Sequence, residues 1–207
     1  MKNNTDLKKL ERKAWTSYHN DGLGDIFLGC VIMMFALAPF LSRTGLGDFW
    51  SSAVFVPFLI LIYVSIVVIR KKIIIPRIGL VNFGRVRRKR LLAFNIIIFF
   101  ILLISLILGV VSLRNTISQT WMHNLRFIAV VLICFGFAGY FLGFLRLYIY
   151  GLLVALSIPL GEWLYSHIGI PHHGFPMTFG ITSGIMIATG IFLYIRLLQK
   201  KPAFEGA

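Results

Sequence analysis

The stretch 125–168, LRFIAVVLICFGFAGYFLGFLRLYIYGLLVALSIPLGEWLYSHI, contains only three charged residues, Arg126, Arg146 and Glu162. A helix needs roughly 20 mostly apolar residues to cross a bilayer, so this stretch is long enough for two such helices. Its two halves are separated by Gly143-Phe144-Leu145-Arg146, which is almost the only interruption between the two apolar runs. We therefore predict two spanning helices, 125–144 and 147–168, joined by a tight turn with Gly143 near the helix end.

The rest of the chain is also rich in apolar residues. Of its 207 residues, 58% are hydrophobic, against about 45–50% in ordinary soluble domains. Four further apolar runs occupy 26–41, 50–69, 91–113 and 177–198. These patterns predict an all-α polytopic integral membrane helix bundle with six transmembrane helices across 26–198. Because a long polar segment precedes the first run, we expect Met1 to be retained.

Positive charge falls in alternate gaps between the apolar runs. If the N-terminal segment 1–25, the loop 70–90, the turn at Arg146 and the tail 199–207 together with Arg196 at the end of the last run share one face, that face holds 18 of the 21 Lys and Arg residues. The positive-inside rule then places both termini in the cytoplasm, with the chain in the cell membrane (plasma or inner). Trp50, Trp121 and Trp163 fall near the predicted outer interface, as expected for indole rings.

The N-terminal segment has the pattern of an amphipathic helix. Its apolar residues Leu7, Leu10, Ala14 and Tyr18 recur at steps of three and four, and basic residues occupy the other side. This pattern predicts an interfacial helix on the inner leaflet. The alternative is a helix that packs on the protein's own cytoplasmic loops.

The loop 70–90 is the only long hydrophilic connection. Its β-branched residues around Pro76 and Gly79 predict a short hairpin or extended ribbon over 73–83. Its basic end directly precedes the third run, and consists of Arg85, Arg87, Arg88, Lys89 and Arg90. We expect these side chains to contact anionic lipid of the bilayer, or only to set orientation. A protein partner or homo-oligomer contact is the alternative, and nucleic acid is disfavoured.

Carboxylates stand at the start of the first two runs. Asp25 and Asp48 each follow Gly-Leu-Gly and are predicted to cap their helices. Asp21 and His19 lie close to Asp25 in the sequence, and a small cytoplasmic proton or cation site there is a second interpretation.

The remaining candidate site residues are predicted to lie on the outer face. Glu162 is the only acidic residue well inside a run, and an intramembrane carboxylate points by default to function; a structural pair with Arg126 is the alternative. Four histidines share this face: His123, His167, His172 and His173. With Glu162 they could bind a divalent metal or a proton. Their spacing matches no strong metal motif, so ordinary hydrogen bonding is favoured and no cofactor is predicted.

Glycines spaced by four residues predict close helix packing. They are Gly180 and Gly184 in the last run and Gly139 and Gly143 in the fourth. Cys30 and Cys134 both fall inside runs and are expected to act as small apolar residues.

The sequence therefore favours a function other than catalysis. The first hypothesis is a small membrane protein that binds or moves a small solute or ion. The second is an assembly or regulatory subunit that acts through the basic loop. The third is a metal-dependent membrane enzyme with a site made by the outer histidines and Glu162.

Overall fold

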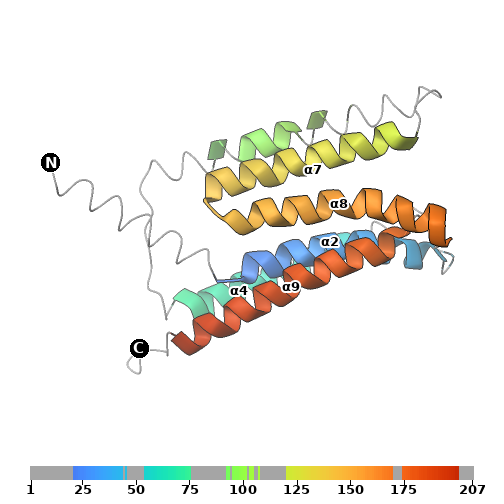
Figure 1. The fold of residues 1–207 in the computed structure, drawn as a ribbon. Helices are drawn as coiled ribbons and strands as arrows, with labels where there is room; N and C mark the ends of the chain where they lie inside the picture. Colours follow the sequence, from blue (N-terminus) through green and yellow to red (C-terminus); the bar gives the residue numbers. More distant parts are fainter. Residues whose placement is uncertain are drawn as a thin grey trace, which may run out of the picture. The chain divides into compact units, whose positions relative to one another are not determined.

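The chain folds as a set of helices. The computed structural model describes residues 21–43, 45, 54–75, 92–93, 95–101, 103–104, 107, 120–169 and 174–200. The elements are α2 (Leu23–Arg43), α4 (Phe55–Ile69), the π-helix η1 (Arg70–Ile74), α7 (Thr120–Leu142), α8 (Leu145–Ile168) and α9 (Phe175–Lys200) (Figure 1). Across the described ranges no strand occurs, in agreement with the all-α prediction.

Four helices are long and apolar enough to cross a membrane: Leu23–Ser42, Asn124–Leu142, Leu145–Ile168 and Phe175–Gln199. They coincide with the predicted spans 26–41, 125–144, 147–168 and 177–198, each within a few residues. Such lengths of apolar helix indicate an integral membrane protein.

The other two predicted spans are covered only in part. Within 50–69, α4 begins at Phe55 and has 15 residues of α-helix before η1 continues it. Within 91–113, the described residues between 92 and 107 are helical. The six-span count therefore stays a prediction, and the N-terminal interfacial helix and the lipid-contact residues of 85–90 lie outside the described residues.

The prediction of a short hairpin or extended ribbon over 73–83 is wrong in part. Residues 73–75, which were assigned to a ribbon, are helical, because the helix of α4 continues past Arg70 through η1. In this extension the side chain of Ile74 is buried, at 0% exposure. Residues 76–83 of the predicted ribbon lie outside the described part of the chain.

Contacts divide the chain into two units, Met1–Asn82 with Phe179–Ala207, and Phe83–Thr178. In the first unit, small residues recur at every seventh position from the start of α2, namely Gly22, Gly29 and Ala36. A Cβ on Gly29 would lie 2.6 Å from Cγ1 of Ile187, and one on Gly190 would lie 2.7 Å from the carbonyl oxygen of Gly22. The small residues thus let α2 and the greater part of α9 pack backbone against backbone.

The second unit contains an antiparallel hairpin of α7 and α8 (Figure 1). Gly143 ends α7 with a φ of 76°, and its N–H donates to the carbonyl of Gly139 at 2.8 Å. Only glycine adopts this left-handed conformation readily. The tight turn that the sequence predicted is confirmed, and α8 follows at Leu145.

The glycine pairs do not act as two equivalent packing motifs. Gly139 packs against the Tyr148 ring, since a Cβ there would lie 2.6 Å from Cε2, whereas Gly143 makes the turn. In α9, a Cβ on Gly180 would be 3.9 Å from the Cβ of Ala36, but one on Gly184 would meet no described atom within 4 Å. Spacing alone does not say which face of a helix meets a neighbour.

Candidate functional site

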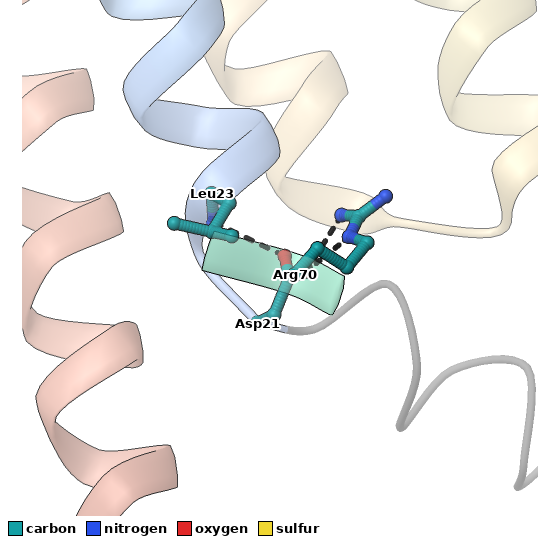
Figure 2. Close-up of polar contacts among 3 residues, drawn as sticks. All are labelled: Asp21, Leu23 and Arg70. Carbon is teal, nitrogen blue, oxygen red and sulfur yellow. Dashed lines mark hydrogen bonds and ion pairs between the residues drawn. The ribbon is translucent and has the colours of Figure 1, made fainter. Parts of the chain in front are cut away.

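The most buried charged group of the described residues lies where α2 begins. Asp21 is 0% exposed and pairs with Arg70 (Figure 2). Its Oδ2 accepts hydrogen bonds from Nη2 of Arg70 at 2.6 Å and from Nε at 3.0 Å. The Arg70 side chain keeps 27% of its surface exposed. The pair therefore joins a fully buried anion to a cation that reaches water.

The start of α2 holds the Asp21 carboxylate in place. Its other oxygen, Oδ1, accepts the backbone N–H of Leu23 at 3.1 Å (Figure 2). The intervening Gly22 has a φ of 77°, which turns the chain into the helix. The side chain of Asp21 thus serves one of the unsatisfied N–H groups at the helix start and binds Arg70 with its second oxygen.

Asp25 is not the cap that the sequence predicted. Because α2 begins at Leu23, Asp25 lies inside the first turn, and Asp21 accepts the N–H at the helix start. A carboxylate in the first turn still interacts favourably with the helix dipole. Asp25 is 2% exposed. Two buried carboxylates therefore lie four residues apart at the start of a helix long enough to span a membrane.

Arg70, the cation of the ion pair, is positioned by the helix that continues from α4. Arg70 directly follows α4 and begins η1, and the N–H of Ile75 donates to the Arg70 carbonyl, five residues back. This is the hydrogen-bond pattern of a π-turn, which occurs often at functional sites. The sequence placed Arg70 in a loop. Its separation of 49 residues from Asp21 left no local signal of the pair.

On the predicted outer face, Glu162 is bound across the α7–α8 hairpin. Its Oε1 accepts a hydrogen bond from Nδ2 of Asn124 at 3.1 Å. The Asn124–Glu162 contact has the same antiparallel register of α7 and α8 as the contact between Phe135 and Gly151, which lies nearer the turn. Glu162 thus has a structural partner on α7, and that partner is one the sequence analysis did not consider.

His167 contributes to the end of α8. Its Nδ1 lies 3.1 Å from the carbonyl oxygen of Trp163 and 2.9 Å from Oγ of Ser166, and its ring stacks on Trp163 with centroids 5.1 Å apart. The histidine therefore supports the last turn of the helix, which Gly169 closes with a φ of 69°.

The other proposed metal ligands are not brought together within the described part. His123 lies in α7, but its side chain is outside the description, as are residues 172 and 173 entirely. Among the described residues, no group of three or more His, Cys, Asp or Glu side chains is placed to hold a metal ion.

Comparison with known proteins finds no matching family model, no similar curated protein and no similar solved structure. The inference about function therefore depends on the residues and their geometry alone.

Proposed function

We propose that the chain binds or moves a small cation through the membrane, and that Asp21 and Asp25 form the binding site. The observation that carries this proposal is the burial of both carboxylates, 0% and 2% exposed, at the start of an apolar helix. Ionised groups in such surroundings are costly to maintain and are commonly associated with ion pathways.

Charge supports a cation over an anion. Asp21 and Asp25 are both carboxylates, and they lie close in sequence at one end of α2. Nearby like charges raise the energy of a buried site, so an added proton or metal cation stabilises it. Arg70 is the built-in competitor for Asp21, and its partial exposure lets it move toward water when another cation arrives.

The test is ion flux into proteoliposomes that contain the purified protein, with protons, Na⁺ and K⁺ tried separately. Asp25→Asn should reduce the flux at least tenfold and leave the helical circular-dichroism signal unchanged. Glu162→Gln is the matched control, because it also neutralises a carboxylate but keeps an oxygen for Asn124. It should retain the flux. Equal flux in wild type and Asp25→Asn, or no flux of the three ions with wild type, would contradict the proposal.

A further inference from the structure

The hairpin of α7 and α8 has an open groove near its turn. The groove has a volume of about 500 Å³ and is lined by Leu132, Ile133, Gly136, Phe137, Tyr140 and Tyr148. Its lining is almost wholly apolar, and both helices that form it are long and apolar enough to cross a membrane. All six residues belong to the second unit, so the groove lies within one part of the chain.

A missing side chain creates the hollow. Leu132, Gly136 and Tyr140 are spaced by four residues and form one row along α7. A Cβ on Gly136 would meet no described atom within 4 Å, whereas one on Gly139 would lie 2.6 Å from the ring of Tyr148. The tyrosine of α8 thus fills the space beside Gly139, and the space over Gly136 stays open.

The shape of the groove suits a single acyl chain better than a second helix. Eight residues separate Leu132 from Tyr140, so the groove extends about 12 Å along the helix axis. Membrane helices approach closely where small residues recur at every fourth position. Here the neighbours of Gly136 in its row are large and stand out, with Leu132 43% exposed and Tyr140 75% exposed. They keep the backbone of another helix, which is about 10 Å across with its side chains, away from the glycine.

The turn end of the groove places a cation and a phenol at the same level. In the register in which Phe135 meets Gly151, Tyr140 lies level with Arg146. The guanidinium of Arg146 lies 4.9 Å from the ring centroid of Phe144, a residue of the turn, and so stays close to the end of the hairpin. A guanidinium can donate two hydrogen bonds to a phosphate, and tyrosine favours the level of the lipid headgroups.

We propose that this groove binds one acyl chain of an anionic phospholipid, with the lipid phosphate beside Arg146 and Tyr140. The acyl chain takes the place of the side chain that Gly136 lacks, and the gain is van der Waals contact, because lipid tails are as apolar as the groove. The charge of Arg146 selects an anionic headgroup. This site goes beyond the proposed cation binding and does not depend on it, since Asp21 and Asp25 belong to the other unit.

Photo-crosslinking in vesicles tests the site. The purified protein is reconstituted into phosphatidylcholine that contains a small fraction of phosphatidylglycerol with a diazirine on one acyl chain, and the adducts are mapped by mass spectrometry. Adducts on the groove residues should exceed those on Phe192 of α9 at least fivefold, although Phe192 is 63% exposed. Replacing part of the phosphatidylcholine by unlabelled phosphatidylglycerol should lower the groove adducts at least threefold.

Three variants separate specific binding from general lipid contact. Gly136→Leu restores the missing side chain of the row and should lower the groove adducts at least fivefold. Gly184→Leu is the matched control, because a Cβ on Gly184 also meets no described atom within 4 Å, and it should leave the groove adducts unchanged. Arg146→Gln should keep the adducts but make unlabelled phosphatidylglycerol and phosphatidylcholine compete equally.

The proposal is supported if the adducts concentrate on the groove and respond to the variants in this way. It is overturned if the wild-type adducts on the groove residues and on Phe192 are equal, a result that needs no variant to fold. It is also overturned if Gly136→Leu keeps the groove adducts, if Arg146→Gln keeps the headgroup preference, or if Gly136→Leu converts a dimer to monomers, since a second copy would then occupy the groove. Ion flux is not part of this measurement, so a failure of the proposed cation function leaves its outcome unaffected.

Discussion

Arg70→Gln removes the cation that compensates a fully buried carboxylate. The carboxyl group of Asp21 would stay at 0% exposure without its guanidinium partner, and it would keep the hydrogen bond from the N–H of Leu23. Removing one partner of a buried ion pair costs about 3–5 kcal/mol. Because Arg70 is 27% exposed, we expect the lower end, about 3 kcal/mol. Asp21→Asn should cost less, about 1.5 kcal/mol, since the freed guanidinium reaches water and a charged hydrogen bond is lost.

The double variant should be no less stable than Asp21→Asn alone, because a neutral amide at position 21 does not need the cation. The free energy of unfolding would be measured by titration with a denaturing detergent for all four proteins. Ser65→Ala removes a hydroxyl that donates a hydrogen bond to the Leu61 carbonyl on the same helix, and it serves as a control for substitution in α4. The reasoning is refuted if Arg70→Gln and Asp21→Asn lower the free energy of unfolding by the same amount and their coupling energy is below about 0.5 kcal/mol.

Three further predictions concern packing, the outer carboxylate and topology. Gly190→Ala should destabilise the first unit by about 1–3 kcal/mol, because its Cβ would lie 2.7 Å from the carbonyl oxygen of Gly22; thermal unfolding in detergent checks this, and Gly184→Ala, whose Cβ would meet no atom of the described residues within 4 Å, should be neutral. Glu162→Gln should shift the same unfolding transition little, by less than about 1 kcal/mol, since its amide oxygen still accepts the hydrogen bond from α7; a larger loss would mean that its charge is structurally required. Single cysteines introduced at Ser118 and Lys201 report topology in intact cells: an impermeant thiol reagent should label position 118 and not position 201 if both termini are cytoplasmic, and the reverse pattern would overturn that orientation.

Several features could be predicted from the sequence because they depend on residues that are close together in the chain. Runs of apolar residues determine which helices are long enough to span a bilayer, and four such helices are present where the runs predicted them. The turn at Gly143 was equally local, since one residue with positive φ ends a helix wherever it occurs.

Only the tertiary structure decided which residues meet. The Asp21–Arg70 pair joins residues 49 apart in sequence, and Glu162 accepts a hydrogen bond from Asn124, 38 residues away. Helical spacing orders side chains around one axis but carries no information on which face a neighbour covers, so a Cβ on Gly180 would contact Ala36 while one on Gly184 would meet no atom of the described residues within 4 Å. Residues Arg70–Ile74 look like the start of a basic loop in the sequence, whereas in the structure they continue the helix of α4, and Arg70 binds a carboxylate 49 residues away.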